Sequence, residues 1–94
     1  MNIAKIYKLI EKFNENISFR KKRKILTKIL KKGVVISFDY EKMNGEVKQV
    51  HSKYNPDYTY DVPPKESNFI YLFDINADFF KHYKLERISN ITFE

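Results

Sequence analysis

The spacing of apolar residues changes once along this chain, at Gly33, and the change sets the order of the elements. Before Gly33 the apolar residues recur at steps of three and four, whereas after it they alternate with polar residues. The first spacing is that of an amphipathic helix, and the second is that of a strand with one buried face. The sequence therefore predicts helices first and an antiparallel sheet afterwards.

Two helices are expected before Gly33. The first covers about residues 3 to 15, and the apolar residues that recur along it are Ile3, Ile6, Tyr7, Ile10, Phe13 and Ile17. Ser18 suits the N-cap of a second helix that runs to about Lys32, where Gly33 supplies the left-handed residue that commonly ends a helix. The buried stripe of this second helix is Ile25, Leu26, Ile29 and Leu30.

Short strands fill the rest of the chain. Val34 to Tyr40 alternates, and Asn44-Gly45 is a strong hairpin signal because both residues tolerate positive φ. Further strands are expected over residues 46–53, 69–74, 80–85 and 88–93, with a shorter candidate over residues 58–62.

This order fits a strongly curved antiparallel sheet or a small barrel of SH3 or Sm type. We predict an α+β single domain, in which two N-terminal helices (residues 1–32) precede a small five-stranded antiparallel SH3/Sm-like barrel (residues 33–94). One or both helices would cover an open end or face of the barrel. The 94 residues suit one domain of modest stability.

Positive charge is concentrated in the helical part. Residues 1–32 hold eleven Lys or Arg against two Glu, a charge of +9, and residues 33–94 hold seven Lys or Arg against ten Asp or Glu, a charge of −3. This asymmetry indicates an anionic partner, with nucleic acid the commonest and acidic protein or lipid surfaces next. The alternative is that the lysines only keep the chain soluble.

The composition argues against most catalytic chemistry. The chain has no cysteine, only two histidines, and only two glycines, so a thiolate nucleophile, a metal site and a glycine-rich phosphate loop are not expected. We therefore predict a non-enzymatic protein without a metal or cofactor. No stretch reaches the ~18 apolar residues that span a bilayer, so a cytoplasmic protein without a membrane partner is expected. Heavy use of Lys, Asn and Ile is typical of AT-rich bacterial or phage genomes.

Three short sequence patterns follow one another in the strand region. They are Ile36-Ser37-Phe38-Asp39-Tyr40, Ile70-Tyr71-Leu72 and the closing run Tyr83-Lys84-Leu85-Glu86-Arg87-Ile88, with Gly45 at the turn after the first. With these patterns residues 30–93 resemble the WYL domain, a small Sm-like barrel of bacterial and phage regulators. Ile70 stands in the place of the tryptophan that gives the family its name.

The resemblance implies a ligand-sensing or nucleic-acid-binding module rather than a catalyst. WYL domains usually follow a helix-turn-helix or winged-helix DNA-binding domain and tune it in response to a ligand, often single-stranded nucleic acid. The two helices expected here cannot form the three-helix core of such a DNA reader. The chain is therefore similar to a solitary WYL-like domain.

Two groups of residues are candidates for contact with nucleic acid. The first is a basic group on the second helix, Arg20, Lys21, Lys22, Arg23, Lys24 and Lys28, which would bind phosphates. The second lies in the patterns that resemble the WYL domain and consists of Tyr71, Tyr83, Lys84 and Arg87. Their alternatives are a solvated helix face, core packing of the tyrosines, and an internal ion pair of Arg87 with Glu86 or Asp39.

The sequence leaves two functions open. The leading one is a module that binds single-stranded RNA or DNA, with phosphate contacts on the basic helix and base contacts on the barrel. The other is a small phage or mobile-element protein that binds and modulates a host protein. In that case the stripe of Ile3, Ile6, Ile10 and Phe13 would be an interface with that protein or with a second copy in a homodimer.

Overall fold

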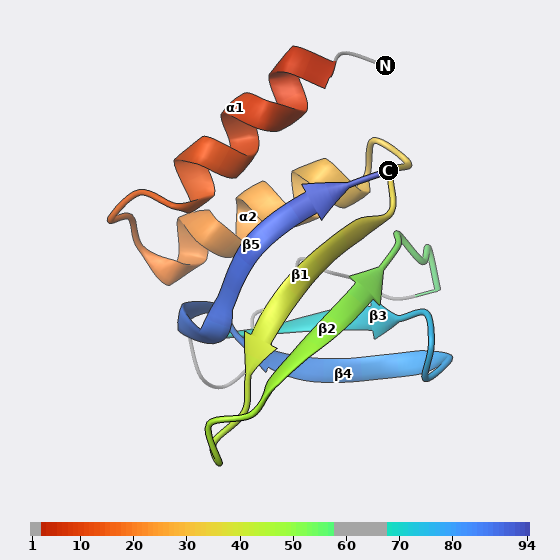
Figure 1. Cartoon of the computed structure of the whole chain (residues 1–94). Helices are drawn as coiled ribbons and strands as arrows, with labels where there is room; N and C mark the ends of the chain where they lie inside the picture. The colour runs from red at the N-terminus through yellow and green to blue at the C-terminus, as the bar shows by residue number, and fades with distance from the viewer. Residues whose placement is uncertain (1–2, 58–67) are drawn as a thin grey trace.

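Two helices precede five antiparallel strands (Figure 1), as the periodicity predicts. The computed structural model describes residues 3–57 and 68–94, so the strand predicted over residues 58–62 lies outside the described part. The elements are α1 (Ile3–Phe13), α2 (Phe19–Leu30), β1 (Ile36–Glu41), β2 (Val47–Ser52), β3 (Phe69–Asp74), β4 (Phe79–Lys84), the short 3₁₀ turn η1 (Leu85–Arg87) and β5 (Ile88–Phe93).

Local signals set the limits of α2. The Ser18 hydroxyl accepts a hydrogen bond from the backbone N–H of Lys21 at 3.2 Å, which satisfies one of the free donors of the first turn. Beyond the other end Gly33 has a φ of +85°, the left-handed conformation that a residue with a Cβ adopts only with strain. Ser18 is confirmed as the N-cap and Gly33 takes the predicted left-handed conformation, but α2 ends at Leu30 with Lys31 as its C-cap, two residues before the predicted end.

The β1–β2 hairpin closes through a loop from Lys42 to Glu46. The backbone N–H of Lys42 donates to the carbonyl of Glu46 at 2.8 Å, and the N–H of Gly45 donates to the carbonyl of Lys42 at 3.0 Å. Of the predicted pair Asn44-Gly45, only Gly45 takes positive φ, at +86°. Asn44 instead uses its side-chain oxygen to accept from the N–H of Glu46 at 3.0 Å. The predicted hairpin is confirmed, with one left-handed residue rather than two.

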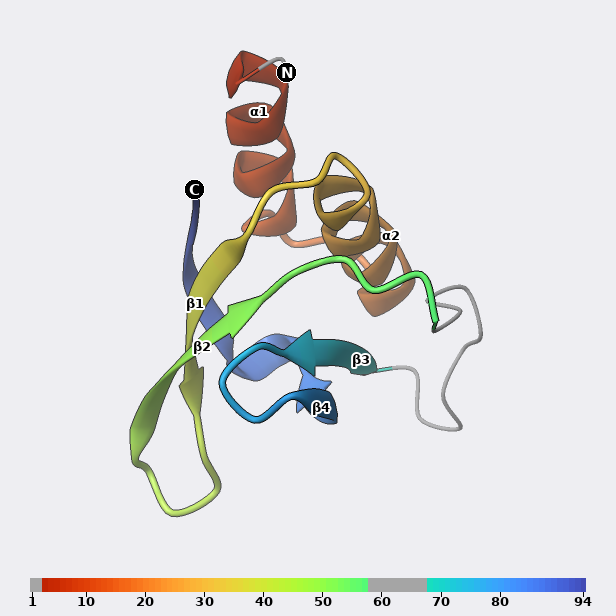
Figure 2. The same ribbon diagram turned by 90° about the vertical axis from the view of Figure 1, so that its right-hand side faces the viewer.

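The sheet stays open. Its strand order is β4-β3-β2-β1-β5, which leaves β4 and β5 as edges, with no pairing between them in the described residues. β2 and β3 share a single paired position, Ser52 opposite Asp74, and there the β3–β4 hairpin turns across the β1–β2 hairpin (Figure 2). The predicted closed barrel is wrong, and the curved sheet is the form observed.

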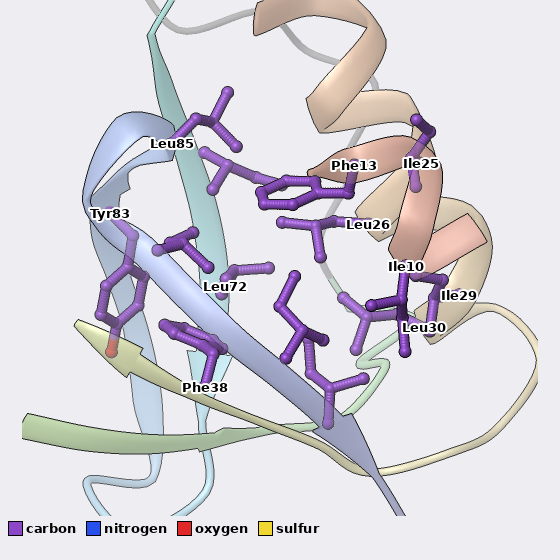
Figure 3. Packing of buried hydrophobic residues seen from close by; sticks show 14 of the residues in the cluster. Ile10, Phe13, Ile25, Leu26, Ile29, Leu30, Phe38, Leu72, Tyr83 and Leu85 are labelled. Atoms are coloured by element: carbon purple, nitrogen blue, oxygen red, sulfur yellow. The ribbon is translucent and has the colours of Figure 1, made fainter. Parts of the chain in front are cut away.

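Side chains from both helices pack against the open sheet. α2 contacts η1, the turn that separates the two edge strands. Phe13 from α1 and Leu26 and Leu30 from α2 pack with Phe38 of β1 and Leu72 of β3 in one buried cluster (Figure 3). Since each of these side chains is at most 1% exposed, this cluster is the core of the molecule.

The apolar stripe of α1 is mostly core. Ile6, Ile10 and Phe13 are buried, whereas Ile3 is 55% exposed. The sequence left open that the whole stripe is an interface with a partner or a second copy. Because most of the stripe is buried inside the molecule, such an interface cannot use all of it. Among the described residues, no helix combines the length and hydrophobicity that crossing a bilayer requires.

Candidate nucleic-acid interface

The outer face of the β3–β4 hairpin carries aromatic rings. Along β3, Ile70 and Leu72 point into the core, so the alternate positions lie on the opposite face. The antiparallel register places the members of this outer face opposite one another across the two strands. We call this set the ring strip: Phe69, Tyr71 and Phe73 on β3, with Phe80 and His82 on β4.

The rings of the strip contact one another. His82 lies between two of them, with its ring centroid 3.8 Å from that of Tyr71 and 5.2 Å from that of Phe69. Farther along, Phe73 and Phe80 meet edge to face at 5.3 Å. His82 is exposed, Phe69 and Tyr71 are half-buried, and Phe73 is buried. The Phe69 end of the strip therefore offers partly exposed rings, on which nucleic-acid bases can stack.

Two cations lie at that same end. The Lys84 ammonium is 5.6 Å from the centroid of the Phe69 ring, within the range of a cation–π contact. From α2, the Arg23 guanidinium donates a hydrogen bond through Nη1 to the backbone carbonyl of Phe69 at 3.2 Å. Arg23 therefore joins the basic helix to the first residue of the ring strip.

The other cations of α2 do not form one continuous face. The Lys22 ammonium turns inward and lies 4.9 Å from the centroid of the Phe13 ring. Lys21, Lys24 and Lys28 follow a spacing of three and four and line a groove between α1 and α2. Arg20 is exposed. The basic run thus divides among the ring strip, the core edge and the interhelical groove, and Arg23 is the member whose described contact reaches the strip.

Tyr83 belongs to the core. It is 4% exposed, and its ring meets that of Phe38 edge to face at 5.5 Å (Figure 3). The Tyr40 ring meets it edge to face at 5.0 Å. The Tyr83 hydroxyl donates to Oδ2 of Asp74 at 3.2 Å. Burial, together with the charge of Asp74 and this hydrogen bond, raises the pKa of the Tyr83 phenol. The structure therefore removes Tyr83 from the predicted contact residues and bears out the core alternative.

Asp74 remains a carboxylate although it is buried. Burial acts to raise its pKa, but hydrogen bonds from the Ala77 backbone and the Tyr83 hydroxyl and the charge of Lys81 outweigh that effect, so its pKa lies below the ordinary value. Asp74 Oδ1 also accepts from the N–H of Asn76 at 3.0 Å, and the Lys81 ammonium lies 3.5 Å from Oδ2. These contacts hold the turn between β3 and β4, and with it the two strands that carry the ring strip.

Arg87 lies elsewhere. Its Nη1 donates to the backbone carbonyl of Glu41 at 3.2 Å, which ties η1 to the end of β1. Neither expected partner holds it: the Asn68 side chain donates to Glu86 at 3.1 Å, and the Asn90 side chain donates to Asp39 at 2.9 Å. Within the described residues Arg87 makes no contact with the ring strip, so the structure does not bring it together with Tyr71 and Lys84.

Sequence reasoning found Tyr71, Lys84 and Arg23 but missed Phe69, Phe73, Phe80 and His82. The available signal was that positions 69, 71 and 73 are all aromatic, one face of a strand. Their neighbours Ile70 and Leu72 hid the alternation, because the run as a whole is apolar and is typical of a central strand buried on both faces.

Within residues 3–57 and 68–94, no group of three or more histidine or acidic side chains is placed to hold a metal ion. Comparison with known proteins found no matching family model, no matching curated protein and no matching solved structure.

Proposed function

We propose that this protein is a non-enzymatic module that binds single-stranded nucleic acid, RNA or DNA, along the ring strip. The observation that carries the proposal is the convergence at Phe69 of partly exposed rings with Arg23 from the basic helix and Lys84 from β4. Aromatic platforms beside cations are how proteins bind unpaired strands, because every base has a face that stacks and every nucleotide has a phosphate.

In the proposed complex, bases stack on the Phe69, His82 and Tyr71 end of the strip. Arg23 and Lys84 contact the phosphates that flank these bases, and exposed Arg20 adds positive potential. The guanidinium of Arg23 suits phosphate contact because it is planar and always charged. The lysines of the interhelical groove contribute to the long-range attraction of a polyanion but not to base contacts.

We further propose that the chain is a WYL-like module. The support is the order of two helices and five short antiparallel strands, together with the residues of the three sequence patterns. Two members of those patterns, Tyr71 and Lys84, lie in the proposed interface, whereas Tyr83 and Arg87 serve the fold. The ligand contacts proposed here therefore rest on the ring strip and not on the resemblance.

Binding of labelled single-stranded RNA and DNA to the whole chain at low salt tests the function. Stacking on one ring contributes about 1–3 kcal/mol, so Tyr71→Ala is expected to weaken binding by about 5- to 150-fold. Tyr7→Ala is the matched control, because Tyr7 is an exposed tyrosine on α1 that packs against Phe93, away from the strip. A duplex of the same sequence should bind more weakly than the single strands.

Failure of both single strands to bind at low salt would overturn the proposal. Equal losses in Tyr71→Ala and Tyr7→Ala would also count against it, because the ring strip would then have no special part. Failure of both strands to bind would favour the other function, docking on an acidic protein surface.

A further inference from the structure

The groove between α1 and α2 has an aliphatic floor. Leu9 of α1, Ile17 of the connecting loop and Ile25 of α2 line it. Ile25 is nearly buried, whereas Leu9 and Ile17 are half-buried and pack against the edge of the core. None of the lining side chains is aromatic, so the groove lacks the flat surfaces on which a nucleobase stacks.

Four lysines surround this floor. Lys12 comes from α1, and Lys21, Lys24 and Lys28 come from α2; no acidic residue lines the groove. The described residues form two ion pairs, Lys42 with Glu46 and Lys81 with Asp74, and neither involves a groove lysine. All four lysines are exposed, and side chains of one sign that line the same groove make it attractive to an anion.

The size of the groove limits what can occupy it. Its volume is about 290 Å³, just below the range of about 300–1,000 Å³ that is usual for small-molecule pockets, so it suits a small ligand. An aliphatic floor favours an alkyl chain, and the lysines favour a negatively charged head. We propose that this groove binds a free amphipathic anion, with a single aliphatic chain on the floor and a carboxylate or phosphate head on the lysines.

Decanoate is a direct probe for this site. Methyl NMR of the whole chain, below the micelle concentration, is expected to show saturable shifts at Leu9, Ile17 and Ile25. Each buried CH₂ should strengthen binding by up to about four-fold, so affinity should rise from butyrate to octanoate. Decan-1-ol has the same chain without the charge and should bind at least ten-fold more weakly than decanoate. Acetate should leave the methyl groups unshifted.

Variants at the lysines test the head-group contacts. Lys24→Gln combined with Lys28→Gln is expected to weaken decanoate binding by at least five-fold. Lys8→Gln is the control, because Lys8 is exposed on α1 and does not line the groove. Equal binding of decanoate and decan-1-ol, absence of methyl shifts, or an unchanged affinity of the double variant would each overturn the proposal.

The same measurements keep this inference separate from nucleic-acid binding. Tyr71→Ala is expected to leave decanoate binding unchanged, because Tyr71 lies on the ring strip and does not line the groove. If the native chain binds decanoate but no oligonucleotide, only the function proposed for the strip is removed. If the native chain binds oligonucleotides but not decanoate, only the groove ligand is removed.

Discussion

Asp74 is the only buried charged side chain in the described part of the chain. A buried carboxylate is costly unless several donors and a cation compensate for the lost water. Here the compensation comes from the backbone of the β3–β4 turn, from the Tyr83 hydroxyl and from Lys81. The same contacts also satisfy the Tyr83 hydroxyl, which explains how a tyrosine can lie in the core.

The lowered pKa of Asp74 predicts a pH dependence of stability. Because its folded pKa lies below the ordinary value of 3.8, the carboxylate stabilises the fold above that pH, and the contribution is lost as the pH falls below it. Asp74→Asn should lower the free energy of unfolding at pH 7 by about 1–3 kcal/mol. The free energy of unfolding of this variant should also differ less between pH 7 and pH 2 than that of the native chain. Urea unfolding of the native chain and the variant at the two pH values measures this. The prediction is wrong if both proteins lose the same free energy of unfolding between pH 7 and pH 2.

At the scale of elements, short-range signals were sufficient for most boundaries. Ser18 identified the start of α2, Gly33 placed its end within two residues, and β5 matches its predicted range of residues 88–93. The signals are local, because a cap or a left-handed glycine acts on its own turn of chain.

Features that depend on distant residues were not predictable in this way. Closure of a barrel depends on whether the two edge strands pair, and among the described residues β4 and β5 do not. The Arg23 contact with Phe69 spans 46 residues. Tyr83 was assigned to the interface because of its place in a sequence pattern, yet its burial follows from Asp74 on the neighbouring strand.

The N-cap of α2 should contribute measurably to stability. Ser18→Ala removes the oxygen that accepts from the N–H of Lys21, and the loss of a cap of this kind costs about 0.5–2 kcal/mol. Five cations near the start of α2 oppose its dipole, so the helix has little else to stabilise its first turn. The control is Ser89→Ala, because Ser89 is an exposed serine on a strand. If urea unfolding gives the same free energy of unfolding for Ser18→Ala and the native chain, the N-cap does not contribute to stability.

At the scale of the whole molecule, charge and rings are divided between two surfaces. The ring strip lies on the outer face of one hairpin, and the lysine-rimmed groove lies between the two helices. Arg23, on α2, belongs to the first surface although it sits within the run that supplies the second. In the proposed complex the ring strip therefore makes the base contacts, whereas the lysines of the groove lie apart from those contacts.

Salt dependence of oligonucleotide binding measures how many cations contact phosphate. Each lost phosphate contact on a single strand reduces the slope of log K against log salt by about 0.7. Lys84→Gln should show one such reduction, because Lys84 lies at the Phe69 end of the strip. Lys53→Gln, an exposed lysine outside both surfaces, should leave the slope unchanged. Equal slopes for Lys84→Gln and the native chain would place Lys84 outside the phosphate contacts.

The unclosed sheet has a consequence for how the molecule behaves when crowded. An unpaired strand offers its backbone to a neighbour's strand and can start a fibril. On β5 this is opposed by Asn90, whose φ of +53° falls where the ladder with β1 shifts register. On β4 it is opposed by Lys81 and Lys84, because charged side chains repel an identical strand. Both edge strands of the described sheet therefore carry a feature that disfavours pairing with a second copy.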